Sequence, residues 1–295
     1  MKRVLCTTLA LLLASTVFVC CQKDGVFNPK QKIDKIYQAY DGGKILSEEW
    51  TWDGNLLNYI AYFKNDTTVL RKSYYFYDKK QLVKIHNTAD LSYVIISYNK
   101  SYYDRIGFYN KFDRKVRSYA FTYDKKKVSK IVLTVYKNPA KSEIRMENDM
   151  MAAFIPKAVL DVTNKQLMHT AFSKADEDDI YTYAIQYDGD NVSEWKISYK
   201  SGDKLTETIL KYGSYDENMN PYYTSFPNLE NVPLAFYKNN PQKITCTQYT
   251  NSVEDGAYTY DYTYKYDAKK YPTEVISKQT AGSYSNSDTA YYTYK

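Results

Sequence analysis

The sequence is poor in the residues that most often carry metal, redox or nucleophilic chemistry. It contains two histidines, His86 and His169, and four cysteines, three of which lie within the first 21 residues. A zinc site needs three or four nitrogen, sulfur or oxygen ligands, and no metal-ligand spacing joins these residues. Cys246 stands alone in the body of the chain, which excludes an internal disulfide there and predicts a buried strand residue. We therefore expect no metal, no cofactor and no enzymatic activity.

Acidic residues suggest two weaker kinds of site. The runs Asp176–Asp179 and Asp188–Asn191 bring carboxylates close together, but Tyr199 stands where a calcium loop beginning at Asp188 carries its twelfth-position Glu. A glycoside hydrolase needs two carboxylates on opposite sides of a sugar, whereas most acids here occupy predicted turn tips. Neither histidine lies near a nucleophile elbow. Calcium binding and hydrolysis are therefore the least favoured interpretations.

Long apolar runs are also absent, except at the N-terminus. Lys2 and Arg3 precede an apolar stretch from Val4 to Val19, after which the composition turns polar. This stretch has the length of a signal-peptide core, and no later stretch approaches the ~18 apolar residues of a spanning helix. We predict a signal peptide over residues 1–20, a tether over 21–30, and a single domain over 31–295 with an irregular insertion at 138–179.

The cysteines at the end of this apolar core resemble the lipobox of bacterial lipoproteins, in which a lipidated cysteine becomes the first residue. Cys20 follows the bulky Val19, whereas Cys21 follows a small residue and has Phe18 three positions upstream. The resemblance implies lipid attachment at Cys21, with Cys20 as the alternative, or else an ordinary signal peptide cut nearby. Several acyl chains hold a soluble domain stably on a membrane. The expected location is the cell envelope, as an outer-membrane lipoprotein facing the periplasm or the cell surface.

Charge of one sign is not concentrated anywhere obvious in the sequence. The chain has 40 Lys and Arg against 34 Asp and Glu, a formal net charge of +6. The lysines fall in short turn clusters such as Lys79-Lys80 and Lys125–Lys127, which discourage strands from pairing edge to edge. Nucleic-acid-binding proteins instead gather basic residues on one stripe or helix. Together with export, this excludes nucleic acid as a partner.

Tyrosine is abundant, and it supplies the apolar surface that other residues would otherwise provide. The chain has 35 Tyr and a mean hydropathy of −0.61. Tyr favours strands and tolerates a face that is only half dry. A strand ending in Tyr-Asp or Trp-Asp, followed by turn residues and a second strand, recurs at Tyr40–Gly43, Trp52–Asn55, Tyr77–Lys80, Tyr123–Lys126, Tyr187–Asp190, Tyr215–Asn218 and Tyr266–Lys269. We expect the Asp to cap backbone N–H groups, and Gly or Asn to supply positive φ.

These turns predict antiparallel hairpins. Every even position from Tyr258 to Tyr266 is Tyr and the odd positions are polar, which is the period of a strand. The turns recur at irregular intervals, unlike the repeats of a propeller or solenoid. The predicted fold is all-β, an antiparallel meander of many hairpins curved into an open barrel or sandwich. At most one or two short helices are expected, one of them at residues 146–154.

Three segments carry a resemblance to a known family. They are Tyr215–Tyr222, Leu234–Pro241 and Tyr264–Val275. With the lipoprotein signal and the Tyr-Asp hairpins, they resemble a group of Bacteroidetes lipoproteins of unknown function with a porin-like, open-barrel β fold. The resemblance covers most of the mature chain and is best over its last third. It implies a partial barrel and no activity. The turns are also similar to the YD repeats of large secreted toxins, but the Gly-Arg pair of those repeats is absent.

The aromatic strand faces are the feature with functional content. Exposed aromatic rings stack on the apolar faces of sugars, and a contiguous exposed patch marks a binding site. The candidate residues are Trp50, Trp52, Trp195, Tyr258, Tyr260 and Tyr262. The alternative is that these rings form the core of a sheet that is poor in Leu and Ile.

The sequence thus predicts a non-enzymatic envelope lipoprotein that binds a ligand, with a glycan as the first candidate, on a sheet face or at a barrel mouth. The alternative is a structural or assembly lipoprotein that contacts other envelope proteins, and a hydrolase is least favoured. The expected partners are the membrane, through the N-terminal lipid, and a glycan or an envelope protein. An integral outer-membrane barrel would need a lipid-facing apolar band, whereas Lys and Asp interrupt many predicted strands.

Overall fold

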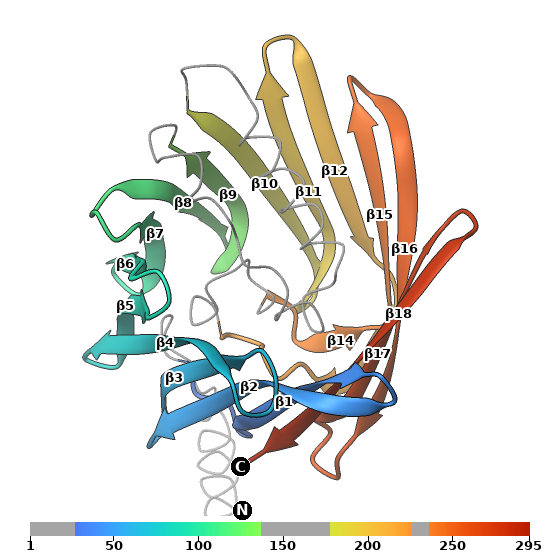
Figure 1. The fold of residues 1–295 in the computed structure, drawn as a ribbon. Helices are drawn as coiled ribbons and strands as arrows, with labels where there is room; N and C mark the ends of the chain where they lie inside the picture. The colour runs from blue at the N-terminus through green and yellow to red at the C-terminus, as the bar shows by residue number, and fades with distance from the viewer. Residues whose placement is uncertain (1–26, 137–177, 226–235) are drawn as a thin grey trace, which may run out of the picture.

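The structure is a computed structural model that describes residues 27–136, 178–225 and 236–295, and these residues form a closed antiparallel β-barrel (Figure 1). The all-β prediction is confirmed, and the barrel is closed, where the sequence suggested an open one. No α-helix occurs among the described residues, and none of them forms a helix long and apolar enough to cross a membrane. The signal segment, both candidate lipidation cysteines and the helix expected at 146–154 lie outside the described residues.

Sixteen strands make up the barrel wall. In chain order they are β1 (Ile33–Tyr40), β2 (Gly43–Asp53), β3 (Leu56–Phe63), β4 (Val69–Asp78), β5 (Gln81–Asn87), β6 (Tyr93–Asn99), β7 (Tyr102–Tyr109), β8 (Lys115–Asp124), β9 (Lys127–Val135), β10 (Asp179–Asp188), β11 (Asn191–Ser201), β12 (Lys204–Tyr212), β15 (Lys243–Thr250), β16 (Val253–Tyr266), β17 (Pro272–Ala281) and β18 (Tyr284–Tyr294). Two shorter strands, β13 (Tyr215–Met219) and β14 (Asn239–Pro241), form a separate two-stranded sheet.

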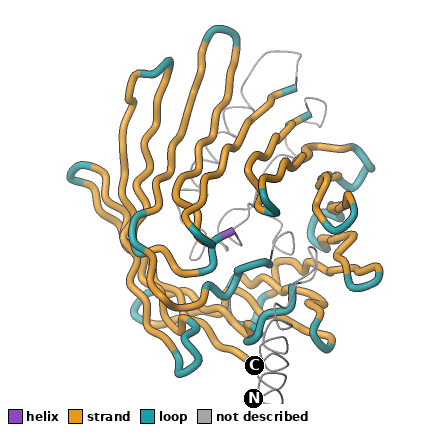
Figure 2. Tube along the Cα trace, turned by 180° about the vertical axis from the view of Figure 1, so that it is seen from behind, coloured by secondary structure: helices purple, strands orange, loops and turns teal. Residues whose placement is uncertain are grey.

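The topology is a meander that closes on itself. Each wall strand pairs with the wall strand that follows it, and β1 pairs with β18 to complete the ring. Because β13 and β14 intervene, β12 pairs with β15. Figures 1 and 2 show the β13–β14 segment inside the ring, near the end where β1 begins and β18 stops. We call this end the terminal end, and the opposite one the far end.

The two faces of the barrel wall differ in polarity. Buried side chains from all sixteen wall strands join one apolar cluster that also includes Tyr222 and Tyr237 from the segment inside the ring, so the apolar face points inward. Cys246 of β15 is buried in this cluster, as predicted. Outward positions on several strands carry charges, and the outward pairs Lys196–Glu207 and Lys265–Glu274 lie at 2.6 and 2.9 Å. The tyrosine alternation along β16 therefore separates a dry interior from a wet exterior.

The hairpin turns follow the predicted positions but differ in chemistry. Lys79 and Lys80 have φ of 46° and 73°, so two lysines adopt the conformation that we expected from Gly or Asn. The Asp cap is present at Asp267, which accepts from the N–H of Lys269 at 2.9 Å. The acids of the two-residue turns, such as Asp78, instead end their strands within the ladder, and the Asp78 carboxylate accepts from no backbone N–H of the described residues. The expected cap is therefore present at some turns and absent from others.

Asp216 departs further from the prediction, because it lies within β13 and not at a reversal between wall strands. Its carboxylate accepts from the N–H of Asn218 at 2.9 Å and from the N–H of Asn240 at 3.2 Å, and also from the Tyr266 hydroxyl. This aspartate therefore joins β13 to β14 and to the end of β16. Asp216 thus belongs to the Tyr-Asp sequence pattern, but it connects three strands and does not cap a hairpin turn.

The aromatic residue before a turn ties neighbouring hairpins together at the terminal end. The Tyr77 hydroxyl of β4 donates to the carbonyl of Leu57 in β3 at 2.9 Å. Leu57 precedes Tyr59, which is the first residue of β3 that pairs with β4, so the Leu57 carbonyl has no partner in the β3–β4 ladder. The same geometry recurs for Tyr98 with Leu82 O, Tyr187 with Val128 O, Tyr294 with Pro272 O, and Trp52 Nε1 with Ile33 O, at 2.6 to 3.0 Å. We call these contacts the aromatic latches.

The aromatic latches provide hydrogen-bond donors for carbonyl groups that lie outside the sheet's ladder of backbone hydrogen bonds. At the terminal end the neighbouring hairpins splay apart, and a carbonyl that lies past the last ladder bond is left without a backbone donor. An unpaired buried carbonyl costs roughly as much as a lost hydrogen bond. Burial raises the pKa of the Tyr77 hydroxyl above its ordinary value of 10, so this group stays protonated and remains a donor.

Replacing Tyr77 with Phe should lower the free energy of unfolding by about 1–2 kcal/mol, because the ring stays buried while the Leu57 carbonyl loses its donor. Urea denaturation measures the change. The matched control is Tyr40→Phe, since that ring is exposed, and it should leave the stability unchanged. Equal effects from both substitutions would contradict the latch.

Candidate functional site

The interior of the terminal end holds a segment that crosses the barrel. It contains β13, the turn after it, and β14. Asn191, at the start of β11, fixes this segment to the wall. Its side-chain oxygen accepts from the N–H groups of Lys238 and Asn239, each at 3.0 Å, and its amide donates to the Asn239 side chain at 3.1 Å. Side-chain amides therefore replace the ladder that an isolated short segment lacks.

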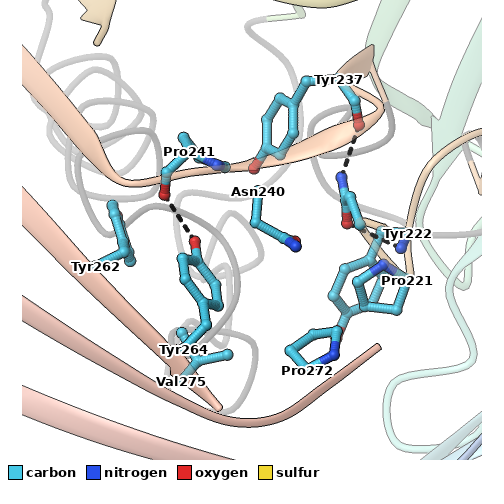
Figure 3. A pocket seen from close by; sticks show the side chains of 10 residues that line it. Pro221, Tyr222, Tyr237, Asn240, Pro241, Tyr262, Tyr264, Pro272 and Val275 are labelled. Atoms are coloured by element: carbon cyan, nitrogen blue, oxygen red, sulfur yellow. Dashed lines mark hydrogen bonds between the residues drawn. The ribbon is translucent and has the colours of Figure 1, made fainter. Parts of the chain in front are cut away.

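A narrow crevice lies between this segment and the inner face of β16 and β17 (Figure 3). The space that its walls enclose is about 20 Å³, which is room for about one water molecule. Its lining residues are Asn220, Pro221, Tyr222, Tyr237, Asn240, Pro241, Tyr262, Tyr264, Pro272 and Val275. Nine of the ten come from the three segments by which the sequence resembles a known family, and Tyr262 lies two residues before the third. The fold thus brings together segments that are well separated in the sequence.

Two polar groups of the crevice keep unused hydrogen-bonding capacity. The Asn240 amide nitrogen makes only long contacts, at 3.3 to 3.5 Å, and its oxygen accepts from no described residue. The Tyr237 hydroxyl likewise bonds to no other group in the described part of the chain. Figure 3 shows the Asn240 side chain reaching into the space between Tyr264 and Tyr222. The crevice therefore offers a ligand the donor and the acceptor of the Asn240 amide, together with the Tyr237 hydroxyl.

Two other polar side chains of the crevice, Asn220 and Tyr264, are committed to hydrogen bonds within the fold. Asn220 donates to Tyr237 O at 2.9 Å and accepts from Tyr222 N at 2.9 Å, while the Tyr264 hydroxyl donates to Pro241 O at 2.8 Å. Asn220 therefore holds the backbone at Tyr222 and Tyr237, which both line the crevice. No charged side chain is among the lining residues.

A buried carboxyl lies on the other side of Tyr222. Glu48 of β2 is 4% exposed and accepts a hydrogen bond from Trp50 Nε1 at 2.8 Å. The Trp50 ring packs against Tyr222, with ring centroids 6.1 Å apart, and the Tyr222 hydroxyl lies 3.3 Å from that of Tyr292. Burial raises the pKa of Glu48 to about 7, and the Trp50 hydrogen bond and the charge of Arg71 only partly oppose it. This carboxyl therefore changes charge near neutral pH.

The aromatic residues predicted as binding candidates all lie on the inner face of the wall. Trp50, Trp195, Tyr260 and Tyr262 are buried, and Trp52 and Tyr258 are half-buried and packed against the core. They do not form one site, since they lie on β2, β11 and β16. Tyr262 is the one of the six that lines the crevice. The buried rings match the alternative stated from the sequence, a core built from aromatic side chains.

Nine of the ten crevice residues were not among the candidates, and they include the polar residues Asn220 and Asn240. These two asparagines each precede a proline, at Asn220-Pro221 and Asn240-Pro241. An Asn before a Pro favours a turn and brings a side-chain amide to it. That signal marks an irregular segment with its own polar anchors, but it says nothing of which wall strands the segment meets.

Metal chemistry finds no support in the described residues, where no three His, Cys, Asp or Glu side chains come together. Asp190, in the run considered for calcium, instead lies 3.4 Å from Lys127 and 3.6 Å from Lys238. His86 lies on the outer face of β5, and His169 and Asp176 lie outside the described residues.

Comparison with known proteins identifies the fold. No family model matches the sequence, and no curated protein matches it at a significant level. A porin-like protein from Bacteroides uniformis ATCC 8492 superposes with a TM-score of 0.54 at 12% identity, covering 93% of this chain and 100% of that one. A porin-like protein from Bacteroides vulgatus ATCC 8482 gives 0.50 at 11% identity, covering 90% and 99%. At such identities the likeness extends to the fold alone.

Glu48 should make the protein less stable as the pH rises. Its pKa is higher in the folded chain than in the unfolded one, so the stability is fully present below pH 4.5 and falls until about pH 7. Glu48→Gln keeps an acceptor for Trp50 and should raise the unfolding free energy at pH 8 by up to about 3 kcal/mol, with little effect at pH 4. Urea denaturation at both pH values measures this.

The matched control is Glu49→Gln, because Glu49 is the next residue and lies on the outer face, 3.6 Å from Lys35. It should leave the pH dependence of the wild type intact. If Glu48→Gln also leaves that dependence intact, Glu48 is not the group responsible.

Proposed function

We propose that this protein is a non-enzymatic, lipid-anchored protein of the bacterial cell envelope that binds a saccharide in the crevice between the β13–β14 segment and β16–β17. The observation that carries the proposal is the lining of that crevice. Tyrosine rings form its walls, and the Asn240 amide and Tyr237 hydroxyl face it with unused hydrogen-bonding capacity.

The lining suits one sugar residue better than most other ligands. A sugar presents an apolar C–H face that packs on aromatic rings, and an edge of hydroxyls that donate and accept together. The side-chain amide of Asn240 matches that edge, because it carries one donor group and one acceptor. The absence of charged lining residues favours a neutral ligand over a phosphate or an amine. Because the enclosed space holds about one water molecule, a sugar would place only a hydroxyl edge in the crevice and lie across its mouth.

The envelope location rests on the N-terminal signal and is consistent with the porin-like fold. A transmembrane barrel has an apolar outer band and a polar interior, whereas this barrel is apolar inside and carries outward ion pairs such as Lys265–Glu274. That polarity favours a water-filled surrounding and an anchor outside the barrel. β1 begins at the terminal end, so a lipid on Cys21 would hold this end nearest its membrane.

The buried carboxyl groups of the interior do not support the hydrolase alternative. The two buried carboxyls among the described residues are Glu48 on β2 and Asp179 on β10. Eight steps around a sixteen-strand ring separate these strands, which places the two groups on opposite sides of the barrel. A pair of acids flanking one bond needs to lie within about 5–9.5 Å.

The alternative role in assembly has one specific observation in its favour. Several large apolar side chains are exposed at the far end, among them Tyr40, Leu91, Phe112, Val253 and Tyr284. Exposed apolar patches mark contact sites on soluble proteins. These residues are spread around the rim and not gathered in one patch, so saccharide binding remains the first proposal.

Asn240→Ala should weaken saccharide binding by about tenfold or more, since a hydroxyl loses both of its partners. The measurement is a glycan-array screen of residues 27–295, which contain every strand of the closed barrel, followed by calorimetry on the hits. The control is Asn58→Ala, an exposed asparagine of β3. Hits that bind both variants equally well would place the site elsewhere, and a screen without hits would exclude the proposed ligand class.

Replacing Cys21 with Ser should abolish incorporation of a radiolabelled fatty acid into the expressed chain and move the protein from the membrane to the soluble fraction, because the acyl chains then have no acceptor. Cys20→Ser is the matched control and should leave labelling intact. Loss of labelling with Cys20→Ser alone would assign the lipid to Cys20. Labelling of neither chain would refute the lipoprotein proposal.

A further inference from the structure

The outer face of the first half of the barrel carries a continuous row of aromatic side chains. On that face Tyr59 pairs across strands with Tyr74, Tyr74 with His86, His86 with Tyr93, and Tyr93 with Tyr109. The rings of Tyr93 and Tyr109 stack with centroids 5.0 Å apart, and those of Tyr59 and Tyr74 lie 5.4 Å apart. We call these five residues the outer tyrosine row.

The row lies on the outside because its neighbours in sequence fill the core. Ile60 and Tyr75 belong to the interior cluster, so the residues beside them face outward. A second, separate apolar cluster of Leu46, Ala61 and Phe63 includes Tyr59 on this outer face. The first strands therefore bury apolar surface on both sides of the sheet.

Lysines lie over the rings of the row. Lys72 Nζ is 4.8 Å from the Tyr59 centroid, Lys84 Nζ is 4.8 Å from that of Tyr93, and Lys115 Nζ is 5.6 Å from that of Tyr109. These are cation–π contacts. None of the three ammonium groups forms an ion pair within the described residues, so their charge is uncompensated.

Two exposed apolar side chains extend this surface. Phe76 and Ile95 are 49% and 38% exposed, and both pair with Lys84, from β4 on one side and β6 on the other. They stand next to the outer tyrosine row, two residues after Tyr74 and Tyr93. Aromatic, basic and exposed apolar side chains are thus interleaved on adjacent strands.

The charge of the described chain is divided in the same way. Residues 33–136, which form β1 to β9, carry 18 Lys and Arg against 11 Asp and Glu. Residues 178–225 and 236–295 carry 11 Lys and Arg against 15 Asp and Glu. One side of the barrel is therefore basic and the other weakly acidic, although the sequence as a whole looks evenly charged.

We propose that the outer face of β3 to β8, formed by the outer tyrosine row, Phe76, Ile95, Lys72, Lys84 and Lys115, rests on the surface of an anionic membrane. Tyrosine rings are preferred at the level of lipid headgroups, where one edge is dry and the hydroxyl is wet. Lysines next to them pair with headgroup phosphates, and Phe76 and Ile95 enter the acyl boundary.

Charge complementarity favours this occupant over a neutral polymer, because this side of the barrel has an excess of basic residues, although Asp113 also lies at the row and accepts from the Tyr93 hydroxyl at 2.9 Å. The tether also bears on the arrangement. Phe27, six residues after Cys21, is buried against Trp52, so a lipid on Cys21 would hold the terminal end within about 20 Å of the membrane. A barrel anchored in this way is able to tilt until the outer face of β3 to β8 meets that membrane. The face would act as a second membrane signal beside the lipid.

The test uses residues 27–295 without any lipid, so it does not depend on acylation or on saccharide binding. We expect this chain to sediment with vesicles in which about a third of the lipid is phosphatidylglycerol and not with pure phosphatidylcholine vesicles, and the binding to weaken with salt. The triple variant K72Q/K84Q/K115Q and the double variant F76S/I95S should each reduce binding by about tenfold.

Matched controls come from the opposite side of the barrel. K200Q/K211Q/K278Q removes three exposed lysines of β11, β12 and β17, and I180S/V253S removes two exposed apolar side chains. Both controls should bind as the wild type does, and circular dichroism should show all four variants folded. Failure of the wild type to sediment with anionic vesicles, or equal losses in test and control variants, would overturn the proposal. So would a dimer that covers this face, detected by light scattering.

Discussion

The barrel depends on the hydrogen bond that an aromatic side chain donates to the backbone of the hairpin before it. At the terminal end the strands of neighbouring hairpins diverge, and carbonyls such as Leu57 O are left past the last ladder bond. At several of these places a tyrosine hydroxyl or a tryptophan N–H donates to the carbonyl from inside the wall. A leucine or valine in the same place would pack equally well but leave the carbonyl unpaired. This requirement gives a physical reason for so much tyrosine in a protein with so little leucine.

Filling the interior with such rings explains how a ring of sixteen strands is supported. A barrel of this size leaves more internal space than the wall side chains of a small barrel would fill. Here buried side chains from every wall strand, many of them aromatic, join one cluster that also contacts the β13–β14 segment, through contacts such as Trp50 with Tyr222. The same packing buries Glu48, and it confines the accessible polar groups near this segment to the crevice around Asn240.

The sequence predicted the class of fold and most of the reversals, because both depend on local patterns. Alternating tyrosines along β16 and the Tyr-Asp pairs at Asp78 and Asp188 are signals of a few residues. Local patterns could not predict that the ring closes, because Tyr37 pairs with Tyr291 only as a result of the curvature of the whole sheet. The crevice was also missed. Asn220 and Asn240 are recognisable as turn residues, but their convergence with Tyr264 depends on the path of the chain across the barrel.

Closure between β1 and β18 has a consequence for how the chain reaches its final state. The strands that complete the ring are the first and last of the wall, paired through contacts such as Ile36 with Tyr292. The edge of β1 that faces away from β2 has no partner until the last residues of the chain are present, and contacts so distant in sequence form slowly. During that interval the open edge is able to pair with other chains. Folding thus competes with aggregation until β18 is in place, and a chain cut short before β18 keeps both edges exposed.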